Sequence, residues 1–161
     1  MRLYIARHAD ALPPASGEGD LSRPLSAWGV QQAHGLARAL GAAESPVDVR
    51  PTQIVHSPAR RAAETARPAC EALGAVPHVD DRLVPNTTVS AVREVIRELV
   101  SSGAPCALVV GHNPCLSDFV RAIDPAAASL QPADVAVFTV DPGGALSSVG
   151  RLRGSTLAED A

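Results

Sequence analysis

Residues 106–114 read Cys-Ala-Leu-Val-Val-Gly-His-Asn-Pro, and this stretch decides the fold class. Its first five residues form an unbroken apolar run, which is typical of a central parallel strand covered on both faces. Gly111 and Pro114 then end the strand, and His112 lies just beyond its carboxyl end. The stretch therefore predicts a buried sheet with helices on both sides and polar chemistry at one edge.

Strands and helices alternate on either side of this run. Further strands are predicted over residues 3–6, 53–56, 134–140 and 146–152, the last two joined as a hairpin by Asp-Pro-Gly-Gly at 141–144. Helices are predicted over residues 26–40, 59–73, 89–100 and after Pro114. We expect an α/β three-layer sandwich, with a mostly parallel central sheet and a C-terminal antiparallel hairpin.

Helix ends and loops complete this outline. Ser26 is the expected N-cap of the first helix, and Gly41 and Gly74 are the expected stops of the first two. The buried face of the first helix is expected to carry four apolar residues: Val30, Ala33, Ala37 and Leu40. Residues 9–25 and 75–88 read as irregular segments. The whole chain, 1–161, is expected to be one domain, with residues 155–161 as a frayed tail.

Composition excludes several function classes. All 14 basic residues are Arg, which excludes lysine nucleophiles, Schiff bases and P-loop lysines. Aromatic residues make up only 2% of the chain, too few for the base-stacking platforms of common nucleic-acid modules. A net charge of −3 also argues against binding nucleic acid or a membrane surface.

The 3 cysteines have no metal-ligand spacing and read as free thiols in a reducing compartment. No apolar run approaches the ~18–20 residues that a membrane span needs, and no signal peptide is evident. We expect a soluble cytoplasmic protein, monomeric in the absence of coiled-coil heptads.

Polar residues follow three of the predicted strands: Arg7-His8, His56-Ser57 and Gly111-His112. Ligands of open α/β sheets bind beyond the carboxyl ends of the strands, so these residues are expected to converge. Arg7 and Arg61 would supply two guanidinium groups, and His8 and His112 two imidazoles, which suits a dianion such as phosphate. The nearby arginines would also lower the pKa of His8 and leave one ring nitrogen unprotonated and nucleophilic.

Four segments, in order along the chain, resemble motifs of the histidine phosphatase superfamily, the phosphoglycerate mutase-like fold. Arg7-His8-Ala9 looks like its Arg-His-Gly signature, with Ala in place of the commoner Gly. Residues 20–26, Asp-Leu-Ser-Arg-Pro-Leu-Ser, are similar to its "RPL-S/T" stretch, and residues 57–66 to its "SPxxRAxxTA" motif. Residues 110–114 resemble its second-histidine motif. Within the superfamily, the chain looks most like the SixA-type phosphohistidine phosphatases.

The resemblance implies a role for each matched residue. His8 would be the nucleophile and would become phosphorylated, and Arg7, Arg61 and His112 would hold the phosphoryl group. Ser57, Arg23 and Asn113 would contact the substrate. No cofactor or metal is expected, because the arginine pair can supply the positive charge that phosphoryl transfer needs.

The substrate depends on whether the site holds a general acid. Ester-cleaving relatives carry an Asp or Glu after the second motif, but residues 83–86, Leu-Val-Pro-Asn, contain none. An alkoxide leaving group needs a proton, and a general acid contributes ~10²–10⁴-fold, whereas protonated imidazole leaves readily. The missing acid favours a phosphohistidine substrate, although Asp20 and Asp81 remain possible acids.

The hypothesis is a phosphohistidine phosphatase that acts on a signalling or phosphotransfer protein and releases inorganic phosphate. Two alternatives stay open. The chain could be a phosphomonoesterase for a small molecule, such as a sugar, nucleotide or vitamin-precursor phosphate, or an inactive phosphate-binding module. A mutase is disfavoured because no acid and no enclosing cap are evident.

Overall fold

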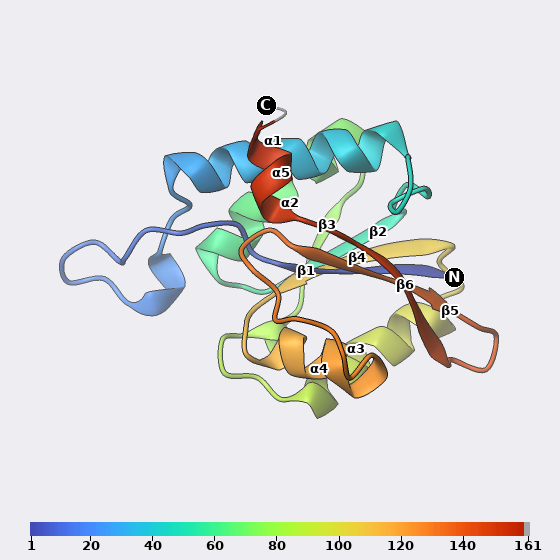
Figure 1. Ribbon diagram of the computed structural model, residues 1–161. Helices are drawn as coiled ribbons and strands as arrows, with labels where there is room; N and C mark the ends of the chain where they lie inside the picture. The colour runs from blue at the N-terminus through green and yellow to red at the C-terminus, as the bar shows by residue number, and fades with distance from the viewer. Residues whose placement is uncertain (160–161) are drawn as a thin grey trace.

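The computed structural model describes residues 1–159 and shows a six-stranded sheet between two layers of helices (Figure 1). The strand order is β3-β2-β4-β1-β5-β6, with bounds β1 Arg2–Arg7, β2 Gln53–His56, β3 Pro77–Val79, β4 Cys106–Gly111, β5 Val135–Val140 and β6 Leu146–Leu152. Strands β3, β2, β4 and β1 are parallel, and β5 and β6 run antiparallel at the other edge. The predicted fold class is confirmed.

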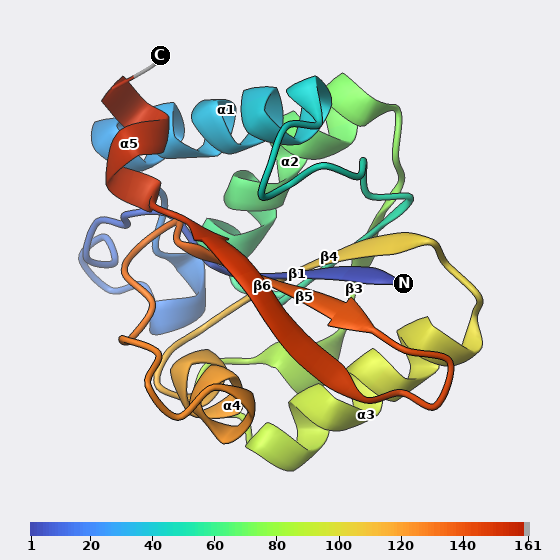
Figure 2. The ribbon, with the colours of Figure 1, turned by 45° about the vertical axis from the view of Figure 1, so that its right-hand side comes forward.

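Helices α1 (Ala27–Ala42), α2 (Arg60–Leu73) and α5 (Gly154–Glu159) cover one face of the sheet, and α3 (Val89–Ser101) and α4 (Cys115–Ile123) cover the other (Figure 2). Two short 3-10 helices, Asp20–Ser22 and Asp81–Leu83, lie in the connections. No helix within residues 1–159 is long and apolar enough to cross a membrane.

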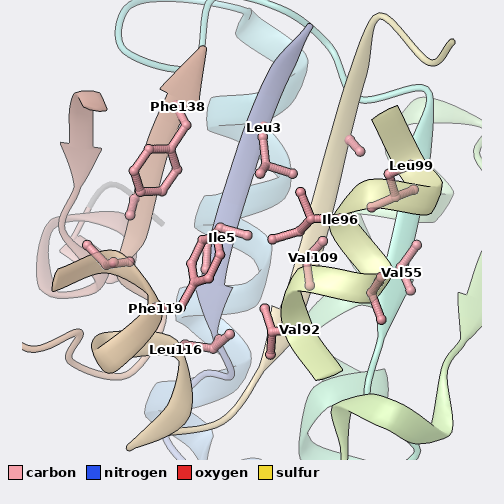
Figure 3. Close-up of a cluster of buried hydrophobic side chains, with 14 of the residues drawn as sticks. Leu3, Ile5, Val55, Val92, Ile96, Leu99, Val109, Leu116, Phe119 and Phe138 are labelled. Carbon is pink, nitrogen blue, oxygen red and sulfur yellow. The ribbon is translucent and has the colours of Figure 1, made fainter. Parts of the chain in front are cut away.

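Side-chain alternation along the strands explains the two hydrophobic cores. On β1, Leu3 and Ile5 pack toward α3 and α4, whereas Tyr4 and Ala6 pack toward α1 and α2. The first core includes Phe119 and Phe138, whose rings meet edge to face with centroids 6.2 Å apart (Figure 3). β4 is buried along its whole length, as the apolar run at 106–110 predicts.

Four details of the sequence-based outline are wrong. Residues 77–79 form β3, inside the segment expected to be irregular, because they pair with β2. Helix α1 runs through Gly41 to Ala42 and is capped by Ala43 in a left-handed conformation. Val30 is exposed rather than part of the buried face. Residues 154–159 form α5, with Leu157 and Ala158 buried, so the expected frayed tail is ordered to that point; residues 160–161 lie outside the described part.

The register of the central strands fixes the position of the polar strand ends. Arg7 is paired with Gly111 between β1 and β4, and His56 is paired with Val110 between β2 and β4. The backbone N–H of His8 continues the first ladder to the Gly111 carbonyl, and that of Ser57 continues the second to the Val110 carbonyl. The residues that follow β1, β2 and β4 therefore lie side by side beyond the carboxyl ends of these parallel strands.

Candidate active site

His8 and His112 lie together just beyond the ends of β1 and β4. Their ring centroids are 5.1 Å apart, and both side chains are buried. Nδ1 of His8 lies 2.7 Å from the carbonyl oxygen of Ala9, so Nδ1 carries the ring proton and Nε2 has a free lone pair. This is the ring nitrogen that faces Arg61.

Arg61, at the start of α2, reaches back to the end of β1. Its Nε donates to Nε2 of His8 across 3.3 Å. The other end of the guanidinium is held by Asp20, since Nη1 donates to the Asp20 carbonyl at 2.8 Å and Nη2 to its Oδ2 at 3.0 Å. The planar guanidinium is thus fixed end-on by Asp20, with its Nε edge directed at His8.

Burial and positive charge keep both histidines neutral. Burial, together with the charges of Arg61 and Arg7, lowers the pKa of His8 to about 4, although the hydrogen bond to Ala9 opposes the shift. Burial, with the charges of His8 and Arg61, lowers the pKa of His112 to about 3. At neutral pH, the pair therefore presents an unprotonated nitrogen rather than two imidazolium groups.

Ser57 holds the second histidine. Its Oγ lies 2.7 Å from Nε2 of His112 and accepts a hydrogen bond from the backbone N–H of Ala59 at 3.1 Å. Because Nε2 is the one acceptor that the described residues offer to the Ser57 hydroxyl, we assign its proton to this bond, which leaves the ring proton of neutral His112 on Nδ1. This buried Nδ1 has no hydrogen-bond partner among the described residues.

Arg7 supplies the second guanidinium at this edge. Its Nη1 donates to the Leu130 carbonyl at 3.1 Å, while its buried Nε has no partner among residues 1–159. Burial lowers the pKa of Arg7, and the like charge of Arg61 lowers it too. The charges of Asp134 and Asp10 oppose this shift. The unpaired donors of Arg7 and His112 and the lone pair of His8 make the site suited to a tetrahedral oxyanion.

The remaining candidates from the sequence are placed less uniformly. Arg23 pairs with Asp20 at 3.4 Å, and its charge contributes to lowering the pKa of His8. Asn113 directs its amide to the Leu130 carbonyl and to Ser117. Asp81 is exposed in the 3-10 helix after β3, and no contact within the described residues joins it to His8.

Asp20 is ionised where it stands. Its partial burial alone would raise the pKa of the carboxyl, but the hydrogen bonds and charges of Arg61 and Arg23 outweigh burial and lower it. The carboxylate therefore holds no proton at neutral pH that it could donate to a leaving group.

Sequence reasoning missed Thr65, a buried residue of α2. Its hydroxyl donates to the Arg61 carbonyl at 2.7 Å and accepts from the backbone N–H of Ala9 at 2.9 Å. One side chain thus ties the loop after His8 to the helix turn that carries Arg61. The contact with Arg61 could have been predicted, because Thr65 lies one helical turn after Arg61 in the motif at 57–66.

Three solved structures share this fold over almost the whole chain. SixA, a protein histidine phosphatase in complex with tungstate, superposes with a TM-score of 0.83 at 24% identity, over 98% of this chain and 99% of its own. SixA of Agrobacterium tumefaciens superposes with a TM-score of 0.77 at 23% identity, over 94% of this chain and 97% of its own. A mycobacterial glucosyl-3-phosphoglycerate phosphatase in complex with inorganic phosphate superposes with a TM-score of 0.73 at 20% identity, over 95% of this chain and 98% of its own.

No curated protein matches the chain. The family comparison is positive: residues 3–84, which contain Arg7, His8, Asp20 and Arg61, match the family model. Together with the fold and the paired histidines and arginines, this match shows that the chain belongs to the histidine phosphatase superfamily (branch 1).

Proposed function

We propose that this phosphatase removes phosphate from a phosphohistidine side chain of another protein, through a covalent phospho-His8 intermediate and without a metal ion. The observation that carries the proposal is the contact between Nε of Arg61 and the unprotonated Nε2 of His8. It places a nucleophilic lone pair and a phosphate-binding guanidinium 3.3 Å apart.

The first step transfers the phosphoryl group to His8. The lone pair on Nε2 attacks phosphorus in line with the leaving nitrogen, so that a P–N bond to the enzyme forms as the P–N bond of the substrate breaks. The imidazole of the substrate leaves as a neutral ring, because its other ring nitrogen already carries a proton. The hydrogen bond from Nδ1 to the Ala9 carbonyl stabilises the positive charge that develops on the His8 ring.

The second step is hydrolysis. Water attacks the phosphorus of phospho-His8, the P–Nε2 bond breaks, and inorganic phosphate leaves with His8 neutral again. In both steps, Arg7, Arg61 and Nδ1–H of His112 would bind the non-bridging oxygens of the phosphoryl group, and Ser57 would keep the His112 proton on Nδ1. The tungstate and phosphate bound by two structural relatives support an oxyanion site of this kind.

The choice of phosphohistidine rests on the proton supply. Asp20 is an ionised partner of Arg61, and residues 83–86 contain no carboxyl group. An alkoxide would leave such a site slowly, because it needs a general acid, whereas a protonated imidazole does not. The shared fold with a phosphatase of glucosyl-3-phosphoglycerate keeps a small phosphate ester as the second candidate substrate.

The test compares two substrates and one variant. Turnover of a phosphohistidine-bearing protein and of an alkyl phosphate ester, whose alkoxide leaving group needs a proton, is measured for the wild type and for His8→Ala. We expect hydrolysis by the wild type only, with a much higher kcat/KM for phosphohistidine. Equal or faster ester cleavage would favour the small-molecule phosphatase. Phosphate binding without turnover of either substrate would identify a binding module, and full activity of His8→Ala would contradict the covalent mechanism.

A further inference from the structure

A closed ring of hydrogen bonds surrounds the carbonyl group that Arg7 contacts. The amide nitrogen of Asn113 donates to the Leu130 carbonyl at 2.8 Å, and the hydroxyl of Ser117 donates to Oδ1 of Asn113 at 2.7 Å. The backbone N–H of Leu130 closes the ring by donating to Oγ of Ser117 at 2.9 Å. Every partner of both side chains lies within this ring.

The ring is partly buried and joins three successive segments of the chain. Asn113 follows β4, Ser117 lies in the first turn of α4, and Leu130 belongs to the connection before β5. Ser117 is 2% exposed and Leu130 is fully buried, so water cannot replace these hydrogen bonds without a cost. Both backbone polar groups of Leu130 are therefore held: its carbonyl accepts from Asn113, and its N–H donates to Ser117.

That carbonyl is also the anchor of Arg7. Nη1 of Arg7 donates to it at 3.1 Å, the one hydrogen bond of this guanidinium within residues 1–159. Arg7 also lies in the field of Arg61, whose like charge repels it. Without this acceptor, the Arg7 guanidinium would lose the hydrogen bond that fixes its orientation, and the repulsion by Arg61 would turn it from the phosphoryl position.

We propose that Ser117 and Asn113 are positioning residues, which hold the Leu130 carbonyl so that the Arg7 guanidinium faces the phosphoryl group on His8. The inference rests on the proposed phosphatase activity and assigns Asn113 a task other than direct contact with substrate. Its amide is occupied by Leu130 and Ser117, so the effect on phosphate passes through Arg7.

The experiment is a double-mutant cycle of Ser117→Ala and Arg7→Ala, with Ser102→Ala as the matched control. Ser102 also donates to a carbonyl, that of Leu99, and accepts from a backbone N–H, that of Ala104, but it lies at the end of α3 near Gln53. Two quantities are measured for each folded variant: kcat/KM, and the affinity for tungstate by calorimetry.

We expect Ser117→Ala to lower kcat/KM by about tenfold or more, as misplacement of a binding group does, and to weaken tungstate binding in parallel. In the Arg7→Ala background, the same change should have almost no effect, and Ser102→Ala should match the wild type. A similar loss with and without Arg7, or no loss at all, overturns the inference.

A replacement variant and a readout that needs no turnover cover the two ways in which the cycle could fail. If Ser117→Ala does not fold, Asn113→Ala replaces it in the cycle, with the same expected outcomes. If the wild type hydrolyses neither substrate, the proposed function fails, but the tungstate cycle still decides whether Ser117 acts through Arg7. Failure of the activity and failure of the positioning role are therefore separate results.

Discussion

Nε of Arg61 donates a hydrogen bond of 3.3 Å to Nε2 of His8, although the two residues lie on different elements and 53 positions apart. The two ends of the guanidinium have different partners: Asp20 binds the terminal nitrogens and His8 faces Nε. A phosphoryl group on Nε2 would take the place of this hydrogen bond, and its oxygens would lie beside an arginine that Asp20 already holds.

Replacement of Arg61 by lysine should abolish this arrangement while it keeps the charge. An ammonium group cannot bind Asp20 and face His8 at the same time, because it lacks the planar fork of the guanidinium. We expect kcat/KM of Arg61→Lys to fall by about 10²–10³-fold, the usual effect of removing one preorganised donor. The control is Arg60→Lys, next in the chain but half exposed and paired with Glu64. Equal losses in both variants would contradict the prediction.

The docking of α5 on α1 gives a prediction about stability. A Cβ atom on Gly35 would lie 1.9 Å from the Leu157 carbonyl oxygen, so Gly35→Ala must push α5 away. We expect a loss of about 1–3 kcal/mol in the free energy of unfolding, as overpacking usually causes. Gly41→Ala, in the same helix with open space around it, should be neutral or slightly stabilising. Urea denaturation of both variants measures the difference, and equal stabilities would show that α5 does not pack closely there.

α5 also shows where sequence-based prediction ends. The long elements were predictable from their apolar residues, which form an unbroken run in β4 and repeat at helical spacing in α3. α5 has only six residues, and its order comes from burial of Leu157 and Ala158 against a helix more than a hundred positions earlier. β3 is three exposed residues that pair with β2, so it has no hydrophobic pattern to detect.

The candidate site divides in the same way. Arg7, His8, Ser57 and His112 could be placed together from the sequence, because each follows the carboxyl end of a predicted strand. The partners of these groups could not be predicted. Asp20 was a candidate acid, but its carboxylate pairs with Arg61, 41 positions away. Asn113 was a candidate substrate ligand, but its amide binds Leu130. Both contacts depend on how loops pack, which no local pattern reports.

The buried histidines should make the protein less stable in acid. Burial lowers the pKa of His8 to about 4 and that of His112 to about 3, below the usual ~6.5 of the unfolded chain. Between the folded and the unfolded pKa values, the unfolded state binds more protons than the folded state. The free energy of unfolding must therefore fall as the pH drops from about 6.5 toward 4. Each histidine can contribute up to about 1.4 kcal/mol per pH unit.

Urea denaturation between pH 7 and pH 4.5 measures this slope. His8→Asn and His112→Asn should each reduce it, because each removes one group that must take up a proton on unfolding. His34→Asn, on the exposed face of α1, is the matched control and should leave the slope as it is. A wild-type slope that persists unchanged in both site variants would assign the acid sensitivity to other groups.

Asp20→Asn distinguishes a carboxylate that orients Arg61 from one that donates a proton. In the structure, Asp20 binds Nη1 and Nη2 of Arg61 and is ionised, so its effect should pass through the guanidinium. The amide keeps the shape but loses the charge that holds Arg61 end-on. We expect kcat/KM to fall by about tenfold for phosphohistidine and for an alkyl phosphate ester alike, since both reactions need Arg61. Glu18→Gln, a loss of charge in the same exposed loop, should change neither. A selective loss of ester hydrolysis would instead identify Asp20 as the general acid, because only the alkoxide leaving group depends on a donated proton.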